Sequence, residues 1–253
     1  MQQRQHMAQP FGRSLRDLQI DLRDGDRPGT VSRLLAGLPD LAEAADPEAA
    51  TAGWAVDARL QGLLAIARAT GTPAAWQTRC PACGSALELA LDPAAFVAPP
   101  RGGPVAWTAP DGTAVTSRLP SGADLAAWRQ GGGDAAALAG RLVESLDDAP
   151  PPAGWTLPED WLGPAESALA EADPLTVLQL AVACPDCRQE SAIAFDLEGW
   201  LIGQLAAVQA GLLDEVHPSP PPITGTEAEI AALPPWRRRA YLARLDRDGG
   251  GWA

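Results

Sequence analysis

The sequence predicts an α+β protein with two zinc knuckles, short β-strands that form a small ribbon-like sheet, flanking helices and an inserted hairpin-and-helix subdomain. Three observations lead to this prediction. All four cysteines lie in two C-x-x-C turns, at residues 80–83 and 184–187, which we call the first and second cysteine turns. Each turn is followed by a short apolar run that favours a strand. Apolar residues recur at helical spacing before the first turn and after the second.

The two turns together predict one tetrahedral zinc site. Two residues between a pair of thiolates allow one tight turn to direct both sulfurs at the same ion, and a second such turn completes the set of ligands. The expected ligands are Cys80, Cys83, Cys184 and Cys187. Four thiolates fill the tetrahedron and leave no position for water or substrate. We therefore expect one zinc ion with a structural role.

Two disulfides, or two separate redox dithiols, are the alternatives to a zinc site. Disulfides are typical of secreted proteins, and the N-terminal sequence MQQRQHMAQPFGRSL has no apolar segment of the kind that a secretory signal needs. Separate dithiols of the thioredoxin kind would not explain why two matched turns occur in one chain. Both observations favour zinc.

The two turns belong to an internal repeat. One stretch, CPACGSALELALD, starts with the first turn, and the other, CPDCRQESAIAFD, starts with the second. Both have an aspartate twelve residues after the first cysteine. Each copy therefore predicts a cysteine turn, a strand at 87–91 or 193–195, and a helix that starts at Asp92 or Asp196.

Residues 1–50 are expected to be poorly structured, because a charged stretch, LRDGDRPGT, and an alanine- and acid-rich stretch offer little apolar surface to bury. A zinc-pinned α+β domain is expected over 51–247, followed by a tail at 248–253. The first segment of this domain, 51–98, contains a helix and the first cysteine turn. One face of that helix carries Val56, Leu60, Leu63, Leu64 and Ala67. Gly71 ends the helix.

The segment 99–172 is predicted to be an inserted subdomain. An Asp-Gly pair at 111–112 lies between two β-biased runs and predicts a hairpin. Ser121, with Asp124 three residues later, resembles a capping box that opens a helix.

Further helices are predicted in the rest of the insert and after the second turn. Asp134 caps one helix, and short helices are predicted at 159–162 and 164–172. One face of the helix after Asp134 carries Leu138, Leu142, Val143 and Leu146. In the segment 173–217, a strand at 175–184 leads into the second turn, and an amphipathic helix follows it. The apolar face of this last helix carries Leu201, Leu205, Val208, Leu212 and Val216.

The segment 218–247 is predicted to be a helical hairpin. Prolines at 218–222 stop the preceding helix, Thr226 and Glu229 form a capping box, and prolines 234–235 begin the second helix. That helix starts with the one strongly basic cluster of an acidic chain: Trp236, Arg237, Arg238 and Arg239. The cluster is a candidate partner-binding surface. The alternative, favoured by the excess of acid, is that its arginines pair with the protein's own carboxylates.

The composition excludes several classes of function. The chain has 19 Lys and Arg residues against 32 Asp and Glu residues, a formal net charge of −13, so we expect no nucleic-acid partner. No apolar stretch of about eighteen residues is present, and no membrane span is expected. His6 and His217 are the only histidines, and no Gly-rich phosphate-binding loop is present. We therefore expect a cytoplasmic protein that is not an enzyme.

Several motifs occur in a recognisable order around the two turns. They are WAVDARLQGLLAIA, RLPSGADL, ADPLTVLQLAVACPDC, LLDEVH and EIAALPPWRRRAYLARL. Together these motifs resemble the baseplate hub assembly chaperones, or baseplate proteins, of T-even-type phages and contractile injection systems. The chain departs from that family after EVH, where PSPPPITGTEAE stands in place of an unbroken helix and an aromatic stretch.

The resemblance implies a non-enzymatic, zinc-stabilised assembly factor for a baseplate hub, with hub or spike proteins as its partners. The residues themselves leave a second possibility, which is a zinc-ribbon adaptor that interacts with nucleic acid or the transcription machinery. The oligomeric state does not follow from either.

Overall fold

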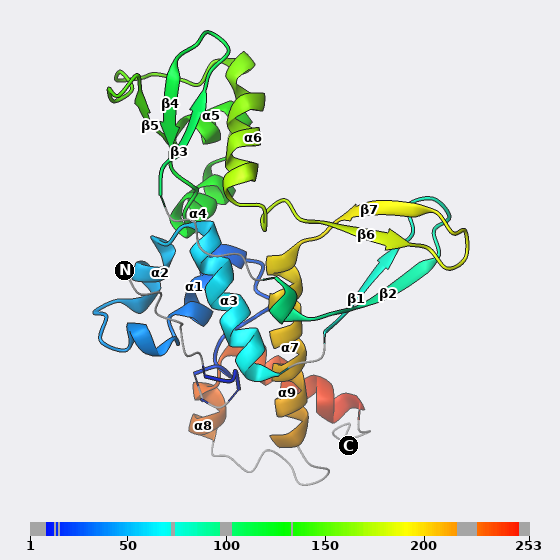
Figure 1. Cartoon of the computed structure of the whole chain (residues 1–253). Coiled ribbons are helices and arrows are strands. Elements are labelled where there is room, and N and C mark those ends of the chain that lie inside the picture. The colour runs from blue at the N-terminus through cyan, green and yellow to red at the C-terminus, as the bar shows by residue number, and fades with distance from the viewer. Residues whose placement is uncertain are drawn as a thin grey trace.

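The computed structural model describes residues 9–12, 14, 16–71, 74–96, 103–132, 134–216 and 227–247. In this part of the chain, helices form the body of the molecule, two β-hairpins project from it, and a small three-stranded sheet with its own helices lies at one end (Figure 1). The architecture is α+β, as the sequence predicts.

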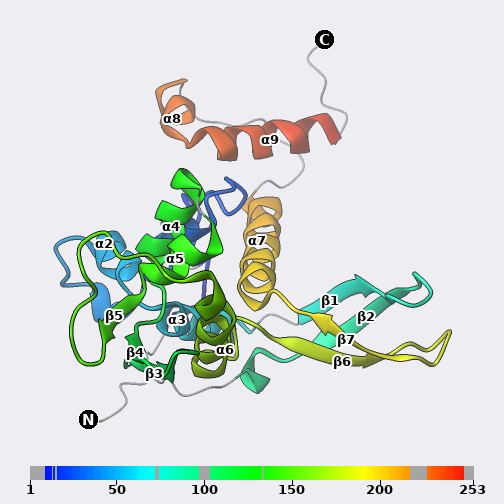
Figure 2. The ribbon, with the colours of Figure 1, turned by 90° about the horizontal axis from the view of Figure 1, so that it is seen from above.

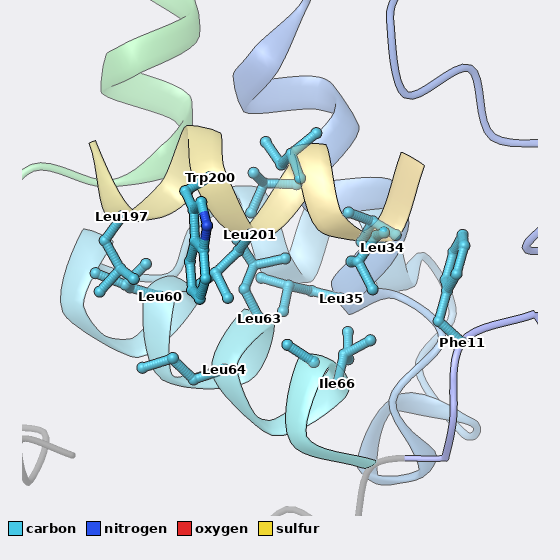
Figure 3. Packing of buried hydrophobic residues seen from close by; sticks show 14 of the residues in the cluster. Phe11, Leu34, Leu35, Leu60, Leu63, Leu64, Ile66, Leu197, Trp200 and Leu201 are labelled. Carbon is cyan, nitrogen blue, oxygen red and sulfur yellow. The ribbon is translucent and has the colours of Figure 1, made fainter. Parts of the chain in front are cut away.

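The body is built around one hydrophobic core shared by three helices. These are α1 (Arg27–Leu35), α3 (Val56–Thr70) and α7 (Leu197–Val216). Figure 3 shows their apolar side chains meeting between the helices. Five leucines of the core have no exposed surface: Leu35, Leu63, Leu64, Leu201 and Leu205. Full burial of one such side chain contributes about 1.5–3 kcal/mol, so this core supplies much of the stability of the body.

The N-terminal region belongs to this body, and the prediction that residues 1–50 are poorly structured is wrong for those that the structure describes. Two further helical segments precede α3, namely η1 (Pro39–Leu41) and α2 (Pro47–Ala52). Phe11 and Ile20 are buried in the main core. The charged stretch that suggested disorder is the start of α1, where the Asp26 side chain accepts a hydrogen bond from the Gly29 backbone N–H.

The predicted helix before the first cysteine turn is confirmed as α3, and Gly71 ends it in the left-handed conformation. The chain then forms two antiparallel hairpins, each with a cysteine turn at its tip. Their strands are β1 (Ala74–Arg79) with β2 (Ala86–Leu91), and β6 (Gln179–Ala183) with β7 (Glu190–Ala194). The sequence pattern does not predict β1, because AAWQTR contains only one large apolar residue.

The prediction of one ribbon-like sheet is wrong in its pairing. The four strands form two separate two-stranded sheets. The hairpins lie side by side in both views of the ribbon (Figures 1 and 2) and meet through apolar side chains and the cysteines. The aspartate that closes each repeat also acts differently in the two copies. Asp92 caps only a 3-10 turn, η2 (Pro93–Ala95), whereas Asp196 accepts a hydrogen bond from the Gly199 N–H at the start of α7.

The insert contains a three-stranded antiparallel sheet with a small core of its own. The strands, in the order β3-β4-β5, are β3 (Val105–Thr108), β4 (Ala114–Ser117) and β5 (Val143–Leu146). The helical segments are α4 (Gly122–Gly131), α5 (Ala135–Gly140), η3 (Glu159–Trp161) and α6 (Leu162–Ala172). The predicted hairpin is confirmed, and so is the capping box of Ser121 and Asp124.

One helix prediction in the insert is wrong. Val143 and Leu146 were expected to continue the helix that Asp134 caps, but α5 ends at Gly140 and both residues lie in β5. β5 pairs with the second edge of β4, where unpaired backbone groups are available. Backbone hydrogen bonding to a strand that is distant in the sequence therefore decides the conformation of this short segment.

The C-terminal segment forms a helical pair, with α8 (Glu227–Ala232) followed by α9 (Pro235–Arg247), which starts where the sequence predicts. Arg244 joins α9 to the body, because its Nε lies 2.6 Å from Asp214 Oδ1. The prolines at 218–222, and Thr226 of the predicted capping box, lie outside the described residues. None of the described helices combines the length and apolar character that a membrane crossing requires.

Candidate metal centre

The four cysteine sulfurs converge at the tips of the two hairpins. Their Sγ atoms all lie within 4.8 Å of one another. Cys80 Sγ is 3.7 Å from Cys187 Sγ, and Cys83 Sγ is 3.7 Å from Cys184 Sγ. A regular tetrahedron with metal–sulfur bonds of about 2.3 Å has sulfur–sulfur edges of about 3.8 Å, so this spacing fits a single tetrahedral ion.

The two turns have the same backbone geometry. In each, the N–H of the residue after the second cysteine donates to the carbonyl of the first cysteine at 2.9 Å, from Gly84 to Cys80 and from Arg188 to Cys184. The N–H of the first cysteine donates to the backbone carbonyl of the residue two places after the second cysteine, Ser85 at 2.9 Å in one copy and Gln189 at 3.0 Å in the other. The internal repeat seen in the sequence is therefore also a repeat of structure.

The ligand set is half buried. Cys80 and Cys184 are 3% and 2% exposed and pack with Leu87 and Val182 between the hairpins. The other two cysteines, one from each turn, are exposed. The first cysteine of each turn thus faces the apolar contact between the hairpins, and the second faces solvent.

The surroundings of the two exposed cysteines shift their pKa values in opposite directions, down for Cys83 and up for Cys187. The side-chain hydroxyl of Ser85, 3.2 Å from Cys83 Sγ, is the main cause that lowers the pKa of Cys83 to about 6. The backbone N–H of Gln189 lowers the pKa of Cys187, but desolvation and the neighbouring thiols outweigh it and raise that pKa to about 12. Thiols this close cannot all ionise without a cation, so a metal ion is needed to hold four thiolates here.

The structure separates the alternatives left open by the sequence. All four cysteines are free, and spacings of 3.7 Å are far longer than the bonded sulfur–sulfur distance of about 2.05 Å. The two turns share one site, which independent redox dithiols would not require. Four clustered cysteines could hold one metal ion, and four thiolates are the donor set typical of structural zinc.

The basic cluster on α9 lies away from the metal centre in both views of the ribbon (Figures 1 and 2). Trp236 Nε1 donates to the backbone carbonyl of Gln19 at 3.2 Å, so this ring contacts the protein's own N-terminal segment. Arg237 donates to the Tyr241 hydroxyl at 3.0 Å and lies over its ring. Arg239 is exposed. The partner-binding role of the basic cluster stays a prediction.

Sequence reasoning missed two features. One is Ser85, which follows the first turn at the position that Gln189 has in the second; the repeat alignment contained this difference. The other is a cleft between the body and the insert that includes Asp173, a residue that the sequence places in an unremarkable Asp-Pro loop. No local pattern signals this cleft, because residues from six separate segments form it.

Comparison of the chain with protein-family models, with curated proteins and with solved structures finds no match.

Proposed function

We propose that this protein is a zinc-stabilised, non-enzymatic assembly factor whose four cysteines bind one structural zinc ion. The observation that carries this proposal is the closed set of four sulfurs, which leaves no coordination position for a substrate. Structural zinc in small domains contributes on the order of 10 kcal/mol of binding free energy, which is ample to hold two hairpins together.

The partner class comes from the order of motifs around the cysteine turns. That order resembles the baseplate hub assembly chaperones, so we propose hub or spike proteins of a contractile injection system as partners, met in the cytoplasm before assembly. The outer face of α9 supports a protein-binding role. Arg239 is exposed on it, and Leu242, one turn further along, is 53% exposed. Arginine is enriched in protein interfaces, and the exposed leucine adds apolar surface next to it.

The test uses purified components. The zinc-loaded chain would be mixed with the hub and spike proteins of a contractile system encoded near its gene, and complex formation would be followed by size-exclusion chromatography with light scattering. We expect a defined complex that Leu242→Glu and Arg239→Glu weaken. Arg141→Glu, which makes the same charge change at an exposed position on the insert, is the matched control. If neither the hub nor the spike protein binds, the baseplate proposal is wrong.

The second candidate function is a zinc-ribbon adaptor for nucleic acid or the transcription machinery. Two hairpins with cysteine turns at their tips favour this candidate, since such modules often contact nucleic acid. The net charge of −13 opposes it. A mobility-shift assay with duplex DNA and single-stranded RNA near physiological salt separates the two, because the assembly-factor proposal predicts no shift.

A further inference from the structure

A cleft lies where the insert meets the body. It has a volume of about 640 Å³, and its lining residues come mainly from α1, α3, α4, α5, α6 and the start of α7. Its interior is mainly aliphatic, with side chains that include Leu60, Leu125, Leu138, Leu162, Leu169 and Leu197. This volume is in the range of small-molecule sites, which lie between about 300 and 1,000 Å³.

Two polar atoms of residues that line this cleft have no hydrogen-bond partner. Asp173 is 3% exposed; the Leu175 backbone N–H donates to its carboxylate, but Oδ2 is unpaired. The indole Nε1 of Trp128 is also buried and unpaired. An unpaired buried polar group is costly, and folded proteins contain few of them. A ligand group that reached these atoms from the cleft would satisfy one acceptor and one donor.

The charges around the cleft select the sign of that molecule. Four carboxylates line it, from Glu166, Asp173, Asp196 and Glu198, against the single guanidinium of Arg27. Arg27 already pairs with Asp196 and lies 3.8 Å from Glu198. Two charges outside the lining act with opposite signs: the Asp57 carboxylate acts on Asp173, and the Arg59 guanidinium acts on Glu198. The uncompensated charge is negative, so a cation is favoured and an anion is repelled.

We propose that this cleft binds a small organic amine whose apolar body fills the leucine-lined interior and whose ammonium group pairs with Asp173. An oxygen acceptor on the ligand would take the free hydrogen bond of the Trp128 indole. A bare metal ion would not use the aliphatic walls, and a neutral apolar molecule would leave Asp173 unpaired. This binding site is independent of the zinc centre and of the proposed assembly role.

The test is a titration of the full zinc-loaded chain with 3-phenoxypropylamine, which has an aromatic ring, an ether oxygen and an ammonium group. Binding would be followed on the indole N–H signals in nitrogen-15 NMR spectra, with Trp128 assigned from the Trp128→Phe variant. The matched probes are 3-phenoxypropionate and 3-phenoxypropan-1-ol, which keep the ring and ether but carry a negative charge or none. We expect the amine to shift the Trp128 signal and to bind about tenfold more tightly than the carboxylate.

Two variants and a control test which carboxylate pairs with the ammonium group of the ligand. Asp173→Asn should weaken amine binding by about tenfold and should leave carboxylate binding unchanged or stronger. Glu166→Gln, at an exposed position in the lining, should weaken amine binding by about twofold. Asp160→Asn, an exposed carboxylate outside the lining, should have no effect. Equal binding of amine and carboxylate, a shift at other indoles but not at Trp128, or full amine affinity in Asp173→Asn would each overturn the proposal.

Discussion

Gly84 and Arg188 occupy the same position in the two cysteine turns, and both have a positive φ, of 78° and 61°. Glycine adopts this left-handed conformation without steric cost, whereas a residue with a Cβ pays about 1–2 kcal/mol for it. The backbone of the second turn is therefore strained at Arg188, whereas that of the first turn is not strained at Gly84. The two turns have the same pattern of backbone hydrogen bonds.

Exchanging these residues should change stability in opposite directions. Arg188→Gly should raise the free energy of unfolding of the zinc-loaded protein by roughly 0.5–1 kcal/mol, after the greater freedom of glycine in the unfolded chain is subtracted. Gly84→Ala should lower it by a similar amount, and no atom near Gly84 would clash with the new methyl group. Urea denaturation measures both. A neutral Gly84→Ala would show that the turn relaxes.

Removal of the metal should loosen the hairpins and leave the body folded. A two-stranded hairpin alone is marginally stable in water, whereas the core of α1, α3 and α7 does not involve the cysteines. We expect one zinc ion per chain by elemental analysis. Chelation should then remove hydrogen-exchange protection from β1, β2, β6 and β7, with little change in helical circular dichroism.

Substitution of one ligand should act as chelation does. Cys80→Ser should lose the bound zinc, whereas Ser85→Ala, beside the same site, should retain it with weaker affinity. A protein that contains no metal, or a body that unfolds together with the hairpins, would contradict this account.

Arg59 holds three helices together from inside the body. Its side chain is fully buried and donates to the carbonyls of Pro28 at 2.7 Å and Thr51 at 2.6 Å and to the Ser32 hydroxyl at 3.0 Å. Arg59→Met should lower the free energy of unfolding by about 3 kcal/mol or more, because these acceptors lose their donor inside the protein.

The matched control for Arg59 lies on the same helix. Arg68 is exposed and donates to the carbonyl of Pro93, so Arg68→Met should cost less than about 1 kcal/mol. Equal effects in thermal and urea unfolding would show that the buried guanidinium is not needed to join α1 and α2 to α3.

Asp173 should make stability depend on pH. Burial, with the nearby Asp57 carboxylate, raises the pKa of Asp173 from 3.8 to about 6. The folded state thus binds the proton more tightly than the unfolded state does, and the contribution of this residue is most favourable below pH 3.8 and is lost as the pH rises through 6. Asp173→Asn should therefore raise the free energy of unfolding at pH 7 by up to roughly 3 kcal/mol, and the gain should vanish below about pH 4.

Asp124 provides a comparison of opposite sign. The hydrogen bond from Arg118 lowers the pKa of Asp124 to about 2. Its contribution is present above pH 3.8 and is lost as the pH falls through 2. Asp124→Asn should lower stability at pH 7, by about 1 kcal/mol because the pair is partly exposed. Unfolding measured from pH 3 to 8 would contradict both assignments if the two variants changed in parallel.

The sequence predicted well the features that depend on neighbouring residues. The cysteine turns and the Ser121 capping box are local patterns, and the structure has both. Most of the predicted apolar face of α3 and the first part of that of α7 also lie in the core, at Leu60, Leu63, Leu64, Ala67, Leu201 and Leu205. The N-terminal helix α1 was missed because its apolar face is short and its capping residues look like a charged linker. β5 was missed because its partner strand comes from a distant part of the insert.

The cleft could not be predicted for the same physical reason. Asp57 lies in the first turn of α3 and Asp173 is the C-cap of α6, and nothing in either local sequence shows that the two carboxylates lie close together. Such a juxtaposition depends on how the insert sits on the body, which is a property of packing. The match of the two cysteine turns was visible in advance because repetition and ligand spacing need no knowledge of packing.

The two hairpins are attached at both of their ends. At their bases, Trp76 of β1 packs edge-on against Phe195, next to β7, with ring centroids 4.9 Å apart, and at their tips the cysteines meet. With one metal ion bound by the four cysteines, the two hairpins and these two junctions would form a closed loop, in which neither hairpin could bend without moving the other. A partner protein that bound and pulled on only one hairpin would then exert force on both hairpins. That force would reach the end of α3 and the start of α7. Without the contact between the cysteines at the tips, the outer parts of the two hairpins could move independently of each other.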